Sequence, residues 1–322
     1  MELRSLGTSE VKITPIIMGT WQAGKEMWVG IDDSETIEAL RAAFEAGITT
    51  IDTAEYYGNG HSERIVGEAL ADVRGQVVYA TKVFSNHLRY DQVMEACHGS
   101  LKNLKTDYLD LYQIHWPAGS WGTELVPIEE TMRALNDLKQ QGEIRAIGVS
   151  VPDTTPDNVI GSLVRGRVDS IQVIYNIFEQ YPEWNLFPVC EKEGTAVIVR
   201  VPFDEGALTG KFTPETTFAE GDVRNHYFRG NNLKSVVQKV NTIREYKDRE
   251  FPQLSMADLA LKFCLTHPAV GTVIPGIRNV AQADMNTRIS DGTYMTLSQQ
   301  KEIKQFSWRK DFWFNEVDQT TL

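Results

Sequence analysis

Residues 77–114 read VVYATKVFSNHLRYDQVMEACHGSLKNLKTDYLDLYQI, two short apolar runs separated by a stretch with helical periodicity. The runs at 77–80 and 109–114 are rich in β-branched and aromatic residues, which favours strands. Between them, residues 91–104 place apolar side chains three or four positions apart, which indicates an amphipathic helix. A strand, a crossover helix and a second strand together predict a parallel β-α-β unit.

The same unit recurs along most of the chain. Further strand-like runs stand at 16–18, 49–51, 144–149, 170–174, 196–201 and 271–274. Further helical stretches stand at 34–46, 62–71, 127–141, 156–165, 184–193, 234–249 and 256–266. Eight strands alternating with helices predict an α/β protein whose parallel sheet closes into a (β/α)8 barrel. A doubly wound open sheet is the alternative, but residues 19–24 poorly match the glycine-rich phosphate turn typical of its first strand.

Several segments lie outside this repeat. Residues 6–9 predict a hairpin turn ahead of the first barrel strand. Residues 203–233 form a long insertion after the seventh strand. From residue 277 onward the sequence adds a helix, a second helix near 298–307 and an aromatic tail at 308–314. Because of its apolar surface we expect the tail to dock on the barrel, where it either covers the substrate mouth or joins two subunits. No low-complexity linker interrupts the chain, so residues 1–322 are predicted to form a single domain.

Composition narrows the class of protein. A length of 322 residues suits one barrel or two average domains, and 42% hydrophobic with 24% charged residues is ordinary for a globular protein. The net charge of −12 disfavours nucleic acid as a partner. No apolar run has the length of a membrane span, and the charged N-terminus does not resemble a signal peptide. Cys97, Cys190 and Cys264 are scattered without metal-ligand spacing, so we expect a cytoplasmic protein without a metal site.

Polar side chains follow three consecutive predicted strands. Asp52, Lys82 and His115 each stand where a strand ends, and Tyr57 lies just beyond Asp52. Taken singly, each has an ordinary explanation as a turn former, a rim charge, a loop filler or a satisfied histidine. The catalytic face of a barrel lies at the carboxyl ends of its strands, and neighbouring strand ends are about 5 Å apart. The four side chains are therefore predicted to converge on one catalytic site.

These four residue types suit the reduction of a carbonyl group. Hydride transfer builds negative charge on the carbonyl oxygen, which then needs a proton. Tyrosine, with an ordinary pKa of about 10, is a reluctant donor. A neighbouring ammonium, Lys82, would stabilise the phenolate and lower the pKa of Tyr57, while Asp52 would keep Lys82 charged and in place. His115 would donate a hydrogen bond that orients the substrate oxygen.

The sequence around these residues resembles the aldo-keto reductases. The resemblance rests on Asp52-Thr53-Ala54-Glu55-Tyr56-Tyr57-Gly58, Thr81-Lys82 and Gln113-Ile114-His115, and continues in Ile147-Gly148-Val149-Ser150, residues 206–211 and Ile274-Pro275-Gly276. It covers essentially the whole chain, and residues 216–218 and 220–225 look closest to bacterial members of the inositol-utilisation type. It implies NADP(H) as cofactor and a small carbonyl compound as substrate, with Tyr57 as acid/base, Lys82 and Asp52 tuning it, and His115 contacting the substrate.

The resemblance also implies positions along the cofactor. Those near the nicotinamide and its carboxamide are Gly19, Thr20, Trp21, Asp52, Ser150, Gln172 and Arg200. Those along the pyrophosphate and the adenosine end are Phe203, Gly206, Leu208, Gly210, Lys211, Arg224, Gly276, Arg278, Gln282 and Asn286. Arg278 follows the eighth strand where the added helix begins, so it is predicted to bind the 2′-phosphate that distinguishes NADPH from NADH.

Two residues depart from the family pattern. Val151 stands where many members have an asparagine that binds the carboxamide. Arg200 stands where many have an aromatic ring stacked on the nicotinamide, although a guanidinium plane can stack on a ring as well.

Two other functions stay open at this point. One is a regulatory protein that keeps the fold and binds NADPH without turnover, as the channel β-subunits of this superfamily do. The other is a barrel lyase or isomerase in which Lys82 forms a Schiff base. Trp21, Trp28, Tyr56 and Trp116 either line an aromatic substrate mouth or pack under loops. The sequence does not indicate the oligomeric state.

Overall fold

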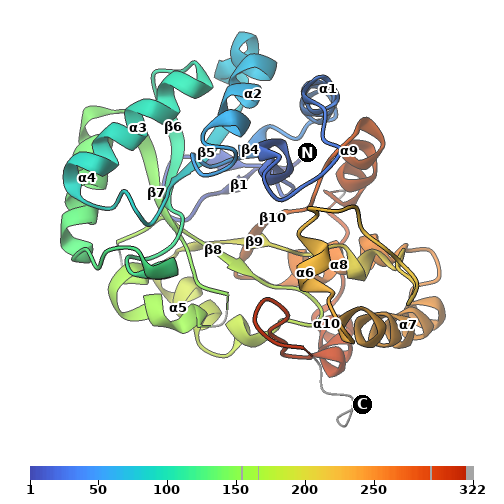
Figure 1. The fold of residues 1–322 in the computed structure, drawn as a ribbon. Helices are drawn as coiled ribbons and strands as arrows, with labels where there is room; N and C mark the ends of the chain where they lie inside the picture. Colours follow the sequence, from blue (N-terminus) through green and yellow to red (C-terminus); the bar gives the residue numbers. More distant parts are fainter. Residues whose placement is uncertain (154, 166, 291, 317–322) are drawn as a thin grey trace.

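The computed structural model describes residues 1–316 except 154, 166 and 291. Eight parallel strands form one sheet in chain order, and Figure 1 shows them surrounded by helices. The strands are β3 (Met18–Gly19), β4 (Thr50–Asp52), β5 (Val78–Val83), β6 (Leu109–Ile114), β7 (Ile144–Ser150), β8 (Ser170–Ile174), β9 (Ala196–Arg200) and β10 (Val270–Ile274). The predicted strands are thus all present.

The first and last strands of the sheet meet each other. Ile16 pairs with Val273 and Gly19 pairs with Gly276, both in parallel. The Ile17 amide donates to the Val273 carbonyl at 2.9 Å. These contacts close the sheet, so the (β/α)8 barrel is confirmed and the open doubly wound sheet is excluded.

Helices cover the outside of the barrel, and the apolar core fills the space between them and the strands. They are α1 (Asp33–Glu45), α2 (His61–Leu70), α3 (Tyr90–Leu104), α4 (Ile128–Gln141), α5 (Leu186–Glu193), α7 (Asn232–Glu250) and α8 (Met256–Thr266). The helix predicted at 156–165 is wrong in type, because Pro156–Val159 forms a 3₁₀ turn and Ile160–Val164 a wider π turn. Gly161 and its β-branched neighbours are poor formers of a regular α-helix. Among the described residues, none of the helices is long and apolar enough to cross a membrane.

The predicted N-terminal hairpin is present and plugs one end of the barrel. Strands β1 (Arg4–Ser5) and β2 (Lys12–Ile13) are antiparallel. Leu6 and Ile13 are fully buried in a second apolar cluster with residues of the barrel interior such as Leu111 and Ile198. At the hairpin turn, Gly7 has φ +58°, and a Cβ there would lie 2.1 Å from the Asp169 carbonyl oxygen. Only glycine fits this turn.

The insertion after β9 and the C-terminal segment lie against each other. The insertion carries α6 (Arg224–Tyr227), and the C-terminal segment carries α9 (Val280–Thr287) and α10 (Leu297–Ile303). The aromatic tail folds back beside the ends of β8 and β9, where Figure 1 draws it as a dark red loop. Its Trp308 amide donates to the Phe178 carbonyl at 2.9 Å, and Phe312 is 2% exposed against Tyr227. The expected docking of the tail is therefore confirmed.

Candidate active site

The four predicted catalytic residues meet at the carboxyl ends of β4, β5 and β6. The Lys82 ammonium lies 2.5 Å from Asp52 Oδ1 and 3.3 Å from the Tyr57 hydroxyl, and it also donates to the Thr53 carbonyl at 2.7 Å. The His115 ring lies edge-on to the Tyr57 ring, with 5.5 Å between the ring centroids. One ammonium thus joins a carboxylate to a phenol beside an imidazole.

Two glutamines hold the second oxygen of Asp52. Gln113 Nε2 lies 3.2 Å and Gln172 Nε2 lies 2.9 Å from Asp52 Oδ2. The sequence suggested that Gln172 binds the nicotinamide carboxamide, whereas its amide nitrogen is here occupied by Asp52. Gln113 was not predicted to have a role. Its position two residues before His115 was the available signal, because alternate residues of a strand share one face.

Burial and charge act in opposite directions on the titration of the site. Burial raises the pKa of Tyr57 above its ordinary value, and Lys82 only partly offsets this increase. The expected net lowering by Lys82 is therefore wrong for this pocket, since removal from water disfavours the phenolate more than the ammonium favours it. Burial alone would lower the pKa of Lys82, but Asp52 and Tyr57 outweigh burial, so the net pKa is raised.

His115 is kept neutral by its surroundings. Burial, Lys82 and Arg200 together lower its pKa well below the ordinary value. Its Nδ1 atom is buried and has no hydrogen-bond partner among the described residues. A neutral imidazole donates from one ring nitrogen, so it can bind a carbonyl oxygen without releasing a proton to it.

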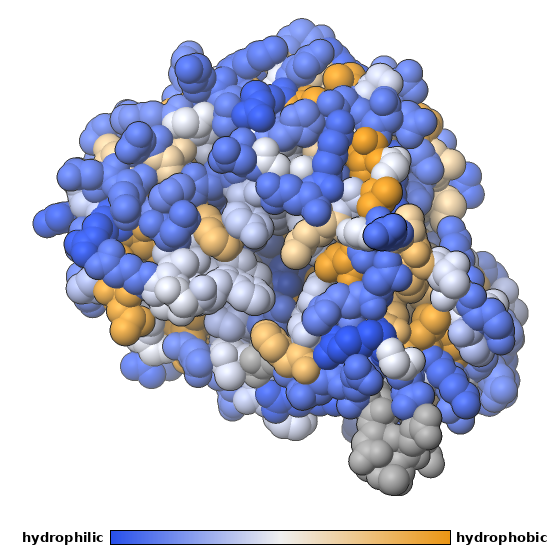
Figure 2. All heavy atoms as spheres, in the orientation of Figure 1, coloured by the Kyte–Doolittle hydropathy of each residue, from blue (hydrophilic) through white to orange (hydrophobic). Residues whose placement is uncertain are grey.

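Aromatic side chains surround the catalytic residues. Tyr56 and Phe84 stack with 4.1 Å between ring centroids, and the His115 and Trp116 rings stack at 5.9 Å. Tyr56 is 44% exposed. Figure 2 shows a hollow near the middle of this face of the barrel, with polar and weakly hydrophobic surfaces around it. Tyr56 and Trp116 therefore lie beside the catalytic residues, as expected for an aromatic mouth and not for packing under distant loops.

Arg200 is held by the loop after β7. Its guanidinium donates to the Val151 carbonyl at 3.1 Å and forms an ion pair with Asp153. It also lies over the Trp116 ring, 5.1 Å from the centroid. Val151, the departure from asparagine, is fully buried and contributes its backbone to this contact. Asp153 was not singled out in the sequence, since nothing there indicated the contact with Arg200.

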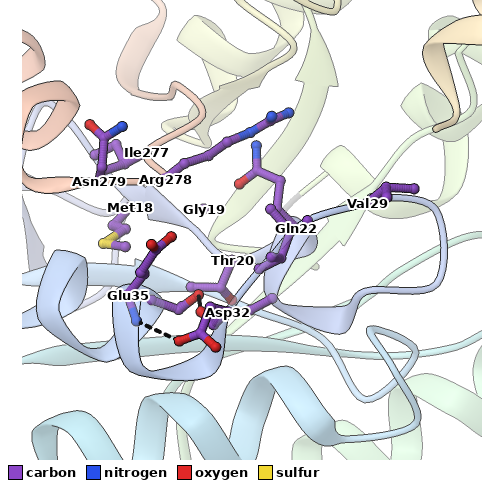
Figure 3. Close-up of a pocket in the computed structure, with 14 residues that line it drawn as sticks. Met18, Gly19, Thr20, Gln22, Val29, Asp32, Glu35, Ile277, Arg278 and Asn279 are labelled. Atoms are coloured by element: carbon purple, nitrogen blue, oxygen red, sulfur yellow. Dashed lines mark hydrogen bonds between the residues drawn. The ribbon is translucent and has the colours of Figure 1, made fainter. Parts of the chain in front are cut away.

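Side chains lie close to the backbone of Gly19 and Gly276. A Cβ at Gly19 would lie 2.5 Å from Ile274 Cγ2, and one at Gly276 would lie 2.9 Å from Gln22 Nε2. Gly19 and Thr20 line a pocket of about 210 Å³ together with Gln22 and Arg278. Figure 3 shows the Arg278 and Gln22 side chains extending into the same space above Gly19.

Trp28 contacts two arginines from distant parts of the chain. The Arg278 guanidinium carbon is 4.4 Å and that of Arg224 is 5.2 Å from the Trp28 ring centroid. Asp222 forms two hydrogen bonds with the Arg224 guanidinium, at 2.8 and 2.6 Å. Burial and then Arg224 lower the pKa of Arg278, so the two positive charges are close enough to interact. Trp28 therefore packs under the arginines and, with Trp21 5.3 Å away, stands apart from the Tyr56–Phe84 stack.

The remaining predicted cofactor residues lie in the loop after β9, near the start of α9 and at the end of β7. In the loop after β9, the Leu208 side chain is fully buried, Phe203 is partly buried against the core and Lys211 is exposed. Gly206 and Gly210 have φ of +101° and +71°. At the adenosine end, Gln282 Oε1 accepts a hydrogen bond from the Arg278 amide at 2.7 Å. Ser150 pairs with Gln172 at the ends of β7 and β8.

The donors around this groove suit a nucleotide with several phosphates. Asn286 is 5% exposed and its Nδ2 has no partner in the described part of the chain, which is an amide donor suited to a base or ribose. Trp28 Nε1 is likewise buried without a described partner. Arg224 and Arg278 add two guanidinium groups beside the same tryptophan. The residues present therefore fit NADP(H).

Known proteins share this architecture over nearly the whole chain. The sequence profile of the Aldo/keto reductase family matches residues 15–307. The chain is 35% identical over 315 residues to aldo-keto reductase YhdN of Bacillus subtilis, covering 94% of this chain and 92% of that protein. It is 31% identical over 318 residues to the NADH-specific methylglyoxal reductase of Escherichia coli, covering 90% and 96%. An aldo/keto reductase from Klebsiella pneumoniae, solved with NADP and acetate, is 25% identical with a TM-score of 0.71, covering 97% and 98%.

The family match spans well over half of the chain, and the barrel, its closure and the strand-end residues agree with it. The chain therefore belongs to the aldo/keto reductase family of NADP(H)-dependent oxidoreductases, which reduce carbonyl compounds by hydride transfer.

Proposed function

We propose that this protein reduces small aldehydes or ketones, that Tyr57 is its proton donor and that it prefers NADPH to NADH. The observation that carries the proposal is the Lys82 ammonium bonded to both Asp52 and the Tyr57 hydroxyl beside neutral His115. A Schiff-base role for Lys82 is less well supported, because its ammonium has three hydrogen-bond partners, Asp52, Thr53 and Tyr57.

In the proposed reaction, side chains of this protein transfer the proton and orient the substrate. Bound NADPH supplies the hydride. Tyr57 gives its hydroxyl proton to the carbonyl oxygen as negative charge develops there. Lys82 stabilises the resulting phenolate, and Asp52 keeps Lys82 charged despite its burial. His115 donates a hydrogen bond to the same carbonyl oxygen and fixes its position.

Arg278 and Arg224 are proposed to select the phosphorylated cofactor. A protein with a net charge of −12 repels a phosphate unless donors are placed against it. Both guanidinium groups lie over the Trp28 ring, so the two positive charges are close to each other. Arg278 also lies one residue before Asn279, whose side chain caps α9. A guanidinium at a helix N-terminus is a favourable phosphate site.

We also propose that residues from several parts of the chain contact the cofactor. They are Gly19, Thr20, Trp21, Asp52, Ser150, Gln172, Arg200, Phe203, Gly206, Leu208, Gly210, Lys211, Arg224, Gly276, Arg278, Gln282 and Asn286. The chain is taken as one domain over 1–322, and the inositol-utilisation type is its suggested subgroup. Cytoplasmic location is supported by three cysteines that are all free and buried, and the net charge argues against nucleic acid as a partner.

Small reactive carbonyl compounds are the proposed substrates. The mouth formed by Tyr56, Phe84 and Trp116 is aromatic, which suits a planar or apolar group next to the carbonyl. Two relatives are named methylglyoxal reductases. The test follows loss of NADPH absorbance with methylglyoxal, an aromatic aldehyde and aliphatic aldehydes, read as catalytic efficiency. Tight NADPH binding with no turnover on any of them would instead support a binding protein.

A further inference from the structure

A lysine of the C-terminal tail is buried in a cage of aromatic rings. The Lys310 side chain is 3% exposed. Its ammonium lies between 5.1 and 5.9 Å from the centroids of the rings of Phe178, Tyr227, Trp308 and Phe312. The Lys310 backbone amide also donates to Glu179 at 3.0 Å. Both the backbone and the charge of this residue are thus fixed by groups from the segment after β8, from α6 and from the tail.

The Lys310 ammonium forms an ion pair with a residue of the loop that follows β9. Its ammonium lies 2.6 Å from Asp204 Oδ1, and the Asp204 side chain is 1% exposed. The Tyr227 hydroxyl donates to the same oxygen at 2.8 Å. Asp204 Oδ2 is buried and has no other partner among the residues described. A buried carboxylate is costly unless it is paired, so Lys310 and Tyr227 determine where Asp204 sits.

This loop has an unusual backbone. Val201, Asp204 and Glu205 have φ of +55°, +52° and +53°, in the left-handed region that residues other than glycine rarely occupy. Val201 is β-branched, for which this region is least favourable. Such conformations persist only where surrounding contacts impose them. The Asn176 amide donates to the Val201 carbonyl at 3.0 Å, and the Lys310–Asp204 pair holds the other end of the turn.

The turn leads directly into residues 206–211, for which the proposed function assigns contacts to the cofactor pyrophosphate. Resting on that function, we propose that Lys310 is a positioning residue, which anchors Asp204 so that the loop after β9 keeps the shape needed to bind NADPH. The C-terminal tail thereby sets cofactor affinity without touching the reacting atoms.

A buried ion pair is weak evidence for a role in stability alone. Apolar residues of similar volume often stabilise a buried site as well as an ion pair does. Here the cage of rings already supplies apolar packing, so a methionine at position 310 would fill most of the same space. What only the ammonium supplies is its contact with two carboxylates, a close one with Asp204 at 2.6 Å and a longer one with Glu179 at 4.0 Å. The pair therefore specifies a loop conformation more than it stabilises the barrel.

The variants are chosen so that the chain still folds. Lys310→Met alone leaves Asp204 charged and buried, so the main variant is the double substitution Lys310→Met with Asp204→Asn. It removes both charges of the Lys310–Asp204 pair and keeps an acceptor for Tyr227, and Glu179 keeps its hydrogen bond from the backbone amide of residue 310. Lys239→Met is the matched control, because Lys239 lies 5.2 Å from the Trp308 ring yet is exposed and makes no ion pair that the described residues show. Circular dichroism verifies folding of each variant.

Two measurements test the proposal. NADPH affinity is measured by fluorescence titration, and hydrogen exchange of residues 201–211 is measured without cofactor. We expect the double variant to bind NADPH about tenfold more weakly, as is typical of coupling between two sites, and to exchange faster in that loop. Its kcat at saturating NADPH should stay near that of the parent. Lys239→Met should change neither quantity.

Unchanged affinity and exchange in a folded double variant would overturn the positioning role and leave the proposed function intact. Faster exchange with unchanged affinity would also overturn it, because the loop shape would then not govern binding. Failure of the parent protein to bind NADPH would contradict the proposed function as well.

Discussion

Lys82 and Asp52 form an ion pair of 2.5 Å, with the Lys82 side chain fully buried and that of Asp52 4% exposed. The other oxygen of Asp52 accepts hydrogen bonds from Gln113 and Gln172, so three side chains hold this carboxylate in place. Burial disfavours the Lys82 ammonium, but Asp52 and Tyr57 together outweigh this effect, so the pKa of Lys82 is raised. The Tyr57 hydroxyl, 3.3 Å from the ammonium, is thereby placed against a permanent positive charge.

We expect Tyr57→Phe to lower the rate of carbonyl reduction by about two to four orders of magnitude, the usual contribution of a positioned general acid. NADPH binding should change little, because the phenol acts on the reacting oxygen. Single-turnover kinetics and a fluorescence titration measure the two effects. Tyr90→Phe, which removes a hydroxyl bonded to Asp137 between α3 and α4, is the control and should keep full activity. Parental turnover in Tyr57→Phe would refute the mechanism.

Arg278→Ala should raise the Michaelis constant for NADPH roughly tenfold or more, consistent with about 1.5–3 kcal/mol for a charged hydrogen bond. The constant for NADH should barely move, because NADH lacks the 2′-phosphate. Arg41→Ala, which removes an exposed arginine paired with Asp72, serves as the control. If both constants rise equally, Arg278 acts through its packing on Trp28 and the phosphate assignment is wrong.

NADPH affinity should fall as the pH rises from 6 to 8. Burial, with Asp204 and Asp153 nearby, raises the pKa of Glu205 to about 7, against the opposing effect of Arg200 and Arg224. The carboxyl is therefore mostly neutral below pH 7 and charged above it. Because its loop is proposed to face the pyrophosphate, the charged form repels the cofactor. Glu205→Gln should bind NADPH more tightly than the parent at pH 8, by several-fold, and equally well at pH 6.

The dissociation constant at both pH values checks this prediction, with NADH measured in parallel. The cofactor's own 2′-phosphate also titrates in this range, and NADH lacks it. A pH dependence that is the same in Glu205→Gln and the parent would assign the effect to the cofactor and not to Glu205.

Gly7→Ala should destabilise the barrel more than Gly142→Ala. Both glycines have positive φ, +58° and +81°, which costs alanine about 1–2 kcal/mol. A Cβ at Gly142 has no atom within 4 Å, whereas one at Gly7 would meet the Asp169 carbonyl oxygen at 2.1 Å. Urea denaturation of both variants gives the difference in free energy of unfolding. This difference measures how much the close contact between the hairpin turn and Asp169 contributes to stability. Equal losses would mean that the hairpin shifts without cost.

The sequence by itself determined the architecture and the candidate chemistry. Strand and helix signals are local, because side-chain period and turn residues act within a few positions. The strand ends also placed Asp52, Lys82 and His115 on one rim before any contact was known, since parallel strands end at the same edge. The one helix mistaken in type, at 156–165, lies where Gly161 and β-branched residues weaken the local preference.

Only the tertiary structure decided which groups touch. Arg224 and Arg278, 54 positions apart, meet on Trp28, and Lys310 reaches Asp204 across 106 positions. The Gln172 side-chain amide donates to Asp52, 120 positions earlier in the chain. The net pKa of Tyr57 depended on how far burial outweighs one ammonium. Long-range pairing and desolvation depend on how the whole barrel packs, and no short window of sequence carries that information.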